Sequence, residues 1–332
     1  MVDTFRSDVK DPQVTTPARA VGSIRRTSHV QMSFEPDGTL VIDGVARDLA
    51  TTVAGSSIRG ASTIHARLTD RHTLLGIDTQ PSPLGIERLV GVLVGPGFRA
   101  TLNDALPEEH AASTPLFLLL DDLPVAALIS GYALMYSGKI GVDREAGRHL
   151  KSDICAGWRS DGTMMVAIRV TGAMPTPVGP VAPDLIRPDD PIGWHDIGPL
   201  PAGSMRRRRL IDVGPGVDDG GTLGVFAMFR DTHADESGIE TVVHEYSLTA
   251  WIDIASGTLV DCVAVPRVLP WNECPAAATS ARQLDGRGLG EIREVVRREL
   301  RGTSTCTHLN DLLRSLGDLP ALASQLEAGR TA

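Results

Sequence analysis

The residues of this sequence that could do chemistry are concentrated near its C-terminal end. Three of the four cysteines and two of the nine histidines lie between His244 and Leu313. Cys274, Cys306, His244 and His308 would together offer two thiolates and two imidazoles, a ligand set that suits zinc or iron. The alternatives are an activated thiol at Cys306 beside His308, or two thiols that serve only as small buried apolar groups.

Local sequence signals predict the elements that would position these four side chains. Residues 244–254 and 258–265 are rich in β-branched and apolar residues around a Ser-Gly turn, which predicts a hairpin. Cys274 precedes Pro275 at a predicted helix start, where free backbone N–H groups would lower the pKa of a thiol. A second helix is predicted near 289–300, and Cys306 and His308 open a third. Because residues two apart on a helix point to different faces, a Cys306–His308 nucleophilic pair is not expected.

Two family resemblances rest on this part of the chain. The segments 270–274, 284–286 and 306–313, the last reading CTHLNDLL, together with Gly302 resemble the signature of a bacterial domain family of unknown function. The order of hairpin, cysteine, amphipathic helix and second cysteine more loosely resembles the iron-sulfur cluster scaffold (IscU-like) fold. That second resemblance implies that Cys274 and Cys306 occupy two thiol positions, and that the first falls near Val243, beside His244 and Glu245.

Composition predicts an ordinary globular protein and excludes several classes. The 332 residues carry a formal net charge of −9, which argues against nucleic-acid binding. No stretch is expected to span a membrane, and the polar N-terminus does not resemble a signal peptide. We therefore expect a cytoplasmic protein without a membrane partner, in which the run from Arg206 to Arg209 is a solvated, salt-bridged strand entrance.

An internal repeat organises the chain. Arg26 to Gly38 and Arg209 to Gly221 both span 12 positions, and each pair brackets a predicted strand and turn. Further on, Asp122-Leu123-Pro124 matches Asp318-Leu319-Pro320. The sequence predicts an α+β fold of two homologous halves, each an antiparallel sheet of about four strands followed by helices, that form a pseudo-dimer. In the first half Thr114 and Leu116 stand where the second half has Cys306 and His308.

The repeat divides the chain into four segments. Residues 1–22 are predicted to be a disordered arm, 23–137 a degenerate N-terminal half, and 205–332 a C-terminal half with the Cys/His cluster. The intervening segment 138–204 is predicted to form a hairpin, with Cys155 and Trp158 across from each other, and a Pro/Gly-rich connector or lid. Trp194 and His195 in that connector are expected either to anchor packing or to contact a substrate.

No nucleotide-binding, P-loop, HExxH or GxSxG motif is present, so no cofactor is predicted, with zinc or iron as the alternative. The first functional hypothesis is an enzyme of the cyclase, cycloaddition, isomerase or lyase type. It would act on a bulky hydrophobic small molecule in specialised metabolism or acyl catabolism. A metal-binding or iron-sulfur scaffold-like protein and a non-catalytic partner protein are the alternatives, and a homodimer is possible. Candidate catalytic residues are His195, His244, Cys306 and His308, with substrate contacts from Trp158, Trp194 and Trp271.

The predicted site lies at the junction of the connector and the second half. The principal pocket is expected to be apolar, lined by residues 150–200 and by the second half, with His195 or His244 among its polar groups. Asp231 and His233 follow the second strand of that half. They are expected to belong to a solvated hairpin loop, or alternatively to tune an imidazole as a general acid or base.

Overall fold

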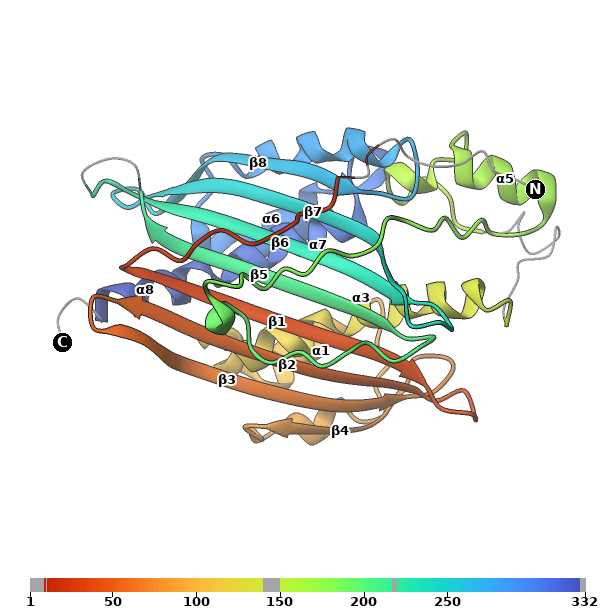
Figure 1. Cartoon of the computed structure of the whole chain (residues 1–332), viewed down its shortest axis with the longest axis horizontal. Coiled ribbons are helices and arrows are strands. Elements are labelled where there is room, and N and C mark those ends of the chain that lie inside the picture. The colour runs from red at the N-terminus through yellow and green to blue at the C-terminus, as the bar shows by residue number, and fades with distance from the viewer. Residues whose placement is uncertain (1–8, 10, 140–149, 217–219, 329–332) are drawn as a thin grey trace.

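A single antiparallel sheet of eight strands forms the centre of the molecule (Figure 1). The computed structural model describes residues 9, 11–139, 150–216 and 220–328. The strand order is β4-β3-β2-β1-β5-β6-β7-β8, so each group of four consecutive strands forms a meander. The two meanders join where β1 pairs antiparallel with β5, and the α+β class expected from the sequence is confirmed.

Each meander is followed by helices in the chain. The first group consists of β1 (Ser23–Phe34), β2 (Leu40–Thr52), β3 (Gly55–Leu68), β4 (Leu74–Gln80), α1 (Phe98–Ala105), α2 (Pro107–Ala112) and α3 (Pro115–Tyr136). Between the groups lies α5 (Thr163–Thr171). The second group consists of β5 (Met205–Pro215), β6 (Thr222–Ala234), β7 (Glu240–Asp253), β8 (Thr258–Val268), α6 (Ile292–Glu299), α7 (Thr307–Ser315) and α8 (Leu319–Ala328).

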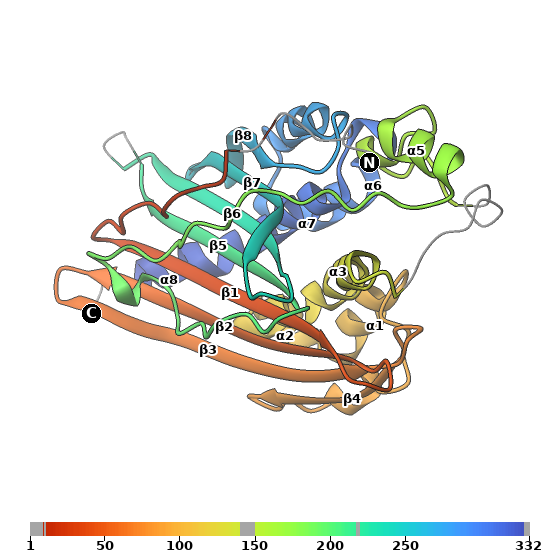
Figure 2. The same cartoon turned by 45° about the vertical axis from the view of Figure 1, so that its right-hand side comes forward.

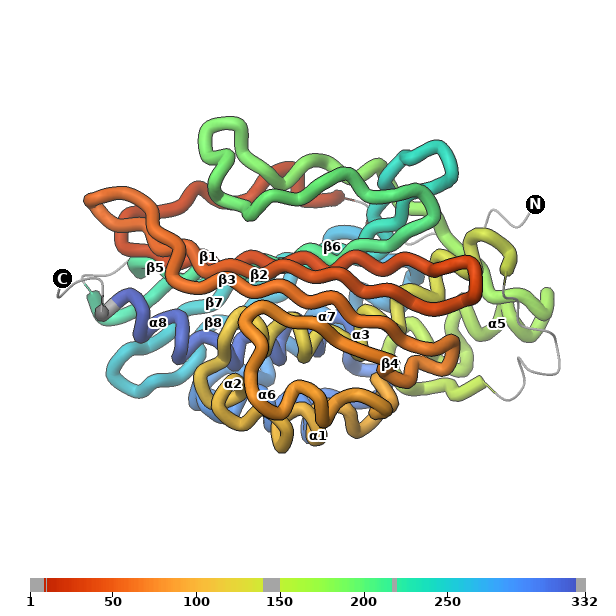
Figure 3. Tube along the Cα trace, turned by 90° about the horizontal axis from the view of Figure 1, so that it is seen from below, coloured from red at the N-terminus to blue at the C-terminus, as the bar shows by residue number. Residues whose placement is uncertain are grey.

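The two faces of the sheet are covered differently. Helices α1, α3, α6 and α7 lie on one face, as the turned view shows (Figure 2). The N-terminal segment and the connector before β5 cross the opposite face (Figure 3). Strand side chains alternate between these two environments, because successive residues of a strand point to opposite faces. We call them the helix face and the strap face.

Two apolar cores lie on the helix face, one for each group of strands. One is built from β1 to β4 and α3, with residues such as Ile42, Phe117 and Leu119. The other is built from β5 to β8, α6 and α7, with residues such as Phe229 and Leu309. A layer of buried arginines and aspartates lies between the cores, and each of these charges is balanced by a partner within hydrogen-bonding distance.

Two buried ion pairs connect the halves reciprocally. Arg26 on β1 donates to Asp318, which immediately precedes α8, with an Nη1–Oδ2 distance of 2.7 Å. Arg209 on β5 donates to Asp122 in α3, with an Nη2–Oδ1 distance of 2.7 Å. Each arginine of one half therefore binds an aspartate of the other half, and all four side chains are almost fully buried.

Several expectations about the charged and terminal segments are wrong. The run from Arg206 to Arg209 is not a solvated strand entrance: it lies inside β5, at the centre of the sheet, where Arg206, Arg207 and Arg209 are each only 1% exposed. Residues 11–22 are not a free arm, since Gln13 binds Glu245 and Arg19 binds Asp190 on the strap face. Neighbouring strands and straps supply the partners that make this burial possible.

The hairpin expected before the connector is also wrong where the structure describes it. Residues 163–171 form α5, which begins after Gly162 and ends at Gly172 in the left-handed conformation. Met164, Met165 and Ile168 are buried, a helical rather than a strand spacing. The segment 156–158 forms a single 3-10 turn instead of a strand.

Helix α3 is longer and more apolar than expected, because the sequence predicts no stretch long enough to span a membrane. Its 22 residues would be long and apolar enough to cross a membrane by length and composition alone. The apolar window that meets this test is 83% buried inside the protein. Such burial on all sides is also typical of the core helix of a globular protein, and α3 packs against β1, β2 and β3.

Candidate functional site

Three polar side chains stand in a row across the helix face of the second half. Arg207 on β5 is the register partner of Asp231 on β6, and Asp231 is the register partner of His244 on β7. Because paired residues of antiparallel strands project to the same face, the three side chains are neighbours. Arg207 donates two hydrogen bonds to Asp231, from Nε to Oδ1 at 2.6 Å and from Nη2 to Oδ2 at 2.8 Å.

Helix α7 adds His308 to this row. His308 is the second residue of α7, and its ring stacks on that of His244 with 3.9 Å between ring centroids and 17° between planes. One ligand atom each from Asp231, His244 and His308 lies within 4.8 Å of the other two. We call these three residues the His/Asp cluster. Among the residues that the structure describes, they form the one group of three or more with this geometry.

Burial determines the charge state of the cluster. It lowers the pKa of His308 to about 3, and the nearby Arg207 guanidinium acts in the same direction. Burial and the neighbouring His308 also lower the pKa of His244 well below its ordinary value, although Asp231 opposes this shift. Burial alone would lower the pKa of Arg207, but the charge and hydrogen bonds of Asp231 raise it above the ordinary value. Both imidazoles are therefore neutral beside an ionised pair.

The cluster has unused hydrogen-bonding capacity. His244 Nδ1 is buried and has no hydrogen-bond partner among the described residues. It lies 3.6 Å from Asp231 Oδ2, which is longer than a hydrogen bond between these groups. A buried polar atom without a partner is costly, and a bound ion or water is a common explanation. Two neutral imidazoles and a carboxylate can each present a lone pair to a cation.

The two predicted thiol ligands lie elsewhere. Cys274 and Cys306 are buried in the core of the second half, and neither belongs to the His/Asp cluster. The expectation of a lowered thiol pKa at Cys274 is wrong, because burial and the neighbouring cysteines raise its pKa well above the ordinary value. Burial likewise raises the pKa of Cys306 to about 12. Both sulfurs are therefore protonated thiols in the metal-free protein.

The predicted substrate-contacting residues divide between two places. Trp271 packs beside Cys274, since a Cβ added at Gly157 would lie 2.8 Å from both the Cys274 sulfur and Trp271 Cδ1. Trp158, next in the chain to Gly157, packs half-buried against the same core. Trp194 is buried on the strap face, in a small cluster with Leu210 and Met228. Trp158 and Trp271 therefore pack with the core of the second half, and Trp194 packs the connector against the strap face of the sheet.

His195 lies on the strap face, away from the His/Asp cluster. Its Nε2 is 2.7 Å from His29 Nδ1, and its Nδ1 is 2.9 Å from Thr27 Oγ1. Burial lowers the pKa of His195 to about 3 and that of His29 to about 4. This hydrogen-bonded pair fastens the connector to β1, so the structure gives His195 a packing role and separates it from His244.

The sequence reading missed two members of the site. Asp231 was expected in a solvated loop, yet it lies inside β6 and is fully buried. Arg207 was read as part of a solvated basic run. The sequence contains one signal for Asp231: it lies 183 positions after Asp48, the same spacing that separates Arg209 from Arg26. Asp48 also binds a buried arginine, Arg26.

These features define an α+β protein with a His/Asp cluster on one half of a continuous sheet, in which Asp231 is buried and both histidines are half-buried. Residues 205–321 match a family described as "Protein of unknown function (DUF2889)". The second half therefore contains a domain of this family, which is consistent with the uncharacterised bacterial family that the segment 306–313 resembles. The match includes every residue of the cluster and Arg207. No curated protein and no solved structure matches the chain, and the iron-sulfur scaffold resemblance gains no support.

Proposed function

We propose that this protein is a metal-binding protein whose second half holds a divalent zinc or iron ion through His244, His308 and Asp231. The observation that carries the proposal is the convergence of three ligand atoms within 4.8 Å at a buried place where His244 Nδ1 has no other partner. Two histidines and one carboxylate suit a catalytic zinc site and also the facial triad of non-haem iron enzymes. Both uses leave coordination positions open to water or substrate.

The pKa values favour a metal over metal-free acid–base chemistry. A general base works best with a pKa near the working pH, whereas burial lowers that of His308 to about 3. Metal binding instead requires neutral imidazole, which this environment favours because protons compete poorly for the ring. Asp231 accepts two hydrogen bonds from Arg207, and its carboxylate would offset part of the cation's charge.

The open positions support an enzyme rather than a storage or scaffold protein. Phe229 and Tyr246 lie on the same face, with the Phe229 ring 6.5 Å from that of His308 and 6.1 Å from that of Tyr246. Both rings are fully buried in the apolar core of the second half, so they pack the site, and the proposal of a hydrophobic small molecule as substrate rests on the sequence composition. The metal would supply Lewis acidity, and the surrounding apolar side chains would exclude water.

We also infer that the two halves are copies of one ancestral domain and form a pseudo-dimer. In a symmetric pair each contact occurs twice with the roles exchanged, as in the Arg26–Asp318 and Arg209–Asp122 pairs. The β-bulges after Asp48 and Asp231 support the same inference.

The copies differ at the site. Gly60 pairs with Asp48 where His244 pairs with Asp231, and Leu116 of α3 takes the place of His308. The carboxylate is retained in the first half without the imidazoles. The proposed metal site therefore exists once in the chain, within residues 205–321.

Metal analysis of the purified protein tests the function. Protein purified without chelator should contain about one zinc or iron ion per chain, and Co²⁺ added to chelator-treated protein should give the visible absorption bands of a protein-bound ion. His308→Ala should weaken Co²⁺ binding at least tenfold, since one of three ligands is lost. His65→Ala is the matched control, because His65 is an exposed histidine on β3.

The control separates the proposed site from adventitious binding to surface histidines. Equal Co²⁺ affinity in His308→Ala and the unmodified protein would overturn the proposal, as would a metal content near zero after expression with either metal in excess. The melting temperature of metal-free His308→Ala should stay close to that of the metal-free parent, which would show that a loss of binding is not a loss of folding.

A further inference from the structure

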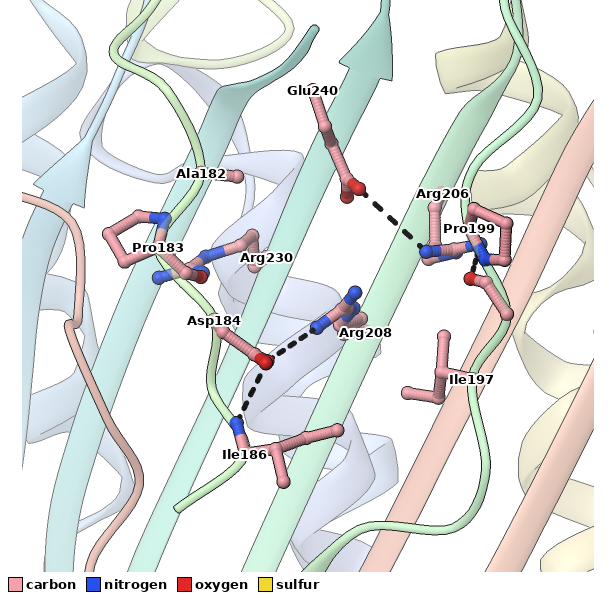
Figure 4. Close-up of a pocket in the computed structure, with 11 residues that line it drawn as sticks. Ala182, Pro183, Asp184, Ile186, Ile197, Pro199, Arg206, Arg208, Arg230 and Glu240 are labelled. Carbon is pink, nitrogen blue, oxygen red and sulfur yellow. Dashed lines mark hydrogen bonds and ion pairs between the residues drawn. The ribbon is translucent and has the colours of Figure 1, made fainter. Parts of the chain in front are cut away.

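A second site lies on the strap face, under the connector (Figure 4). Here Arg206, Arg208 and Arg230 surround a cavity of about 250 Å³ between two passes of the connector. Ile186 and Ile197 from these two passes form apolar walls. The cavity lies where the sequence predicts a pocket, at the junction of the connector and the second half, but its charged groups are three arginines, Asp184 and Glu240, and not His195 or His244. It is not the principal cavity that the sequence predicts, because a larger one of about 370 Å³ lies within the first half.

The arginines converge because of strand geometry. Arg206 and Arg208 are alternate residues of β5 and so project to the same face. Arg208 is the register partner of Arg230 on β6. The opposite face of β5 carries Arg207 and Arg209, whose charges the buried aspartates balance. The strap face of β5 therefore concentrates a second set of positive charges next to a cavity.

Two of these three guanidinium groups are incompletely paired. Arg230 donates to Glu245 at 2.5 Å and to the Pro183 carbonyl at 2.6 Å, so its role is structural. By contrast, Arg208 approaches its ion-pair partner, Asp184, only to 3.9 Å, and Arg206 approaches Glu240 only to 3.8 Å. These distances are well beyond the 2.7–2.9 Å of a charge-assisted hydrogen bond.

Two donors of these arginines lack partners in the part of the chain that the structure describes. The Nε groups of Arg206 and Arg208 are buried and have no hydrogen-bond partner among the described residues. Arg206 is 1% exposed, although its Nη2 donates to Gln31 and to the Gly198 carbonyl. Burial and the neighbouring Arg208 lower the pKa of Arg206 to about 10, although Glu240 opposes the shift. An anion between these two arginines would satisfy free donors and relieve repulsion between like charges.

We propose that this cavity binds a small organic carboxylate, with its anionic group between Arg206 and Arg208 and its apolar body against Ile186 and Ile197. Arginine recognises a carboxylate through paired N–H donors, and Arg208 has such donors without a hydrogen-bond partner among the described residues, whereas Nη2 of Arg206 is already bonded to Gln31 and Gly198. The walls favour a ligand with a short apolar chain or ring over a bare inorganic anion. The site is separate from the His/Asp cluster, because the two use opposite faces of the sheet.

Calorimetric titration of the full chain with three probes tests this proposal. Benzoate supplies a carboxylate on an apolar ring, benzamide has nearly the same shape without the charge, and inorganic phosphate has the charge without the apolar body. We expect benzoate to bind most tightly, with benzamide and phosphate at least tenfold weaker. Arg208→Gln should weaken benzoate binding at least tenfold, and Arg208→Lys should fall between that variant and the parent protein.

Arg67→Gln is the matched control, because Arg67 is an exposed arginine paired with Glu35 on the other half of the sheet. It should bind benzoate like the parent protein. Arg208 is chosen over Arg206 because its side chain makes no hydrogen bond to another described residue, so its loss should disturb packing less. A far-ultraviolet spectrum of each variant checks folding. The proposal is overturned if benzoate does not bind at millimolar concentration, if phosphate binds more tightly, or if Arg208→Gln retains parent affinity.

Discussion

At the residue scale, the two proposed sites depend on which charges have partners. Asp231 and Arg207 pair with each other, and burial keeps His244 and His308 neutral, so both imidazoles have a lone pair for the proposed cation. On one face of β5, Arg207 is paired with Asp231 beside the proposed cation site. On the other face, Arg208 lacks a close partner among the described residues beside the proposed anion site.

The cysteines allow a prediction at the same scale. Cys306 stands at the N-cap position of α7, with extended backbone, whereas Cys262 is fully buried within β8. Cys306→Ser should change the free energy of unfolding by less than about 1 kcal/mol, because a serine hydroxyl at an N-cap accepts from free N–H groups. Cys262→Ser should cost about 1–3 kcal/mol, because its hydroxyl enters an apolar core.

Chemical denaturation of both variants measures this difference, with metal content as a second readout. Cys306→Ser should retain the parent's metal content, since its sulfur is outside the His/Asp cluster. Loss of metal from Cys306→Ser with unchanged stability would make the thiol a ligand and contradict the assignment. A larger stability loss at Cys306 than at Cys262 would contradict the capping argument.

At the element scale, β1, β5, α3 and α8 are held together by the reciprocal ion pairs. Arg209 has Asp122 as its carboxylate partner, with further hydrogen bonds to Ser315 and the Asp311 carbonyl. Arg26 has two carboxylate partners, Asp48 and Asp318. Both junctions therefore contain a buried arginine–aspartate pair, but Arg26 has a second carboxylate partner to share its charge, in contrast to Arg209.

This inequality predicts unequal mutational costs. Asp122→Asn should lower the free energy of unfolding by about 3–5 kcal/mol, because it leaves the buried Arg209 without an anionic partner. Asp318→Asn should cost less, since Arg26 retains two hydrogen bonds to Asp48 and the second partner of Asp318, Arg293, is 21% exposed and can be solvated. Urea denaturation measures both variants, with Glu35→Gln, in an exposed ion pair, as the control. Equal or reversed costs would mean that Asp48 does not compensate.

At the scale of the whole molecule, the continuous sheet makes the two halves one structure. Strands β1 and β5 pair along nine residue positions from Ile24 to Met32, and the buried charges cross the same boundary. Separating the halves would expose two central strands and leave buried arginines without partners. We therefore expect the halves to unfold together, although each has its own apolar core.

The tryptophans provide a probe for this expectation. Trp158, Trp194, Trp251 and Trp271 all lie after residue 150, so fluorescence reports on the connector and the second half. Circular dichroism reports on the backbone of both halves. The two signals should follow one coincident urea transition in the parent protein. A circular dichroism transition that precedes or follows the fluorescence change would show that the halves unfold independently.

The sequence by itself determined the features that depend on local chemistry. Strands such as β1 and β2 follow from alternation around the Pro36-Asp37-Gly38 turn, and α7 follows from the spacing of Leu309, Leu312 and Leu313. The spacing of the repeat also predicted strands of matching position in the two halves. The strand and helix signals arise between residues a few positions apart, and the repeat compares one stretch of sequence with another, so both can be read without knowledge of the fold.

The tertiary structure decided which side chains meet and which charges are buried. Asp231 reaches His244 through strand register, and His308 reaches both because α7 packs on β6. Four consecutive arginines look solvated in sequence, yet the pairing of β5 with β1 and β6 places them at the sheet centre. The carboxylate partners lie far away in the chain: Asp231 is 24 positions from Arg207, and Asp122 is 87 positions from Arg209. Only folding brings these opposite charges close enough to make their burial favourable.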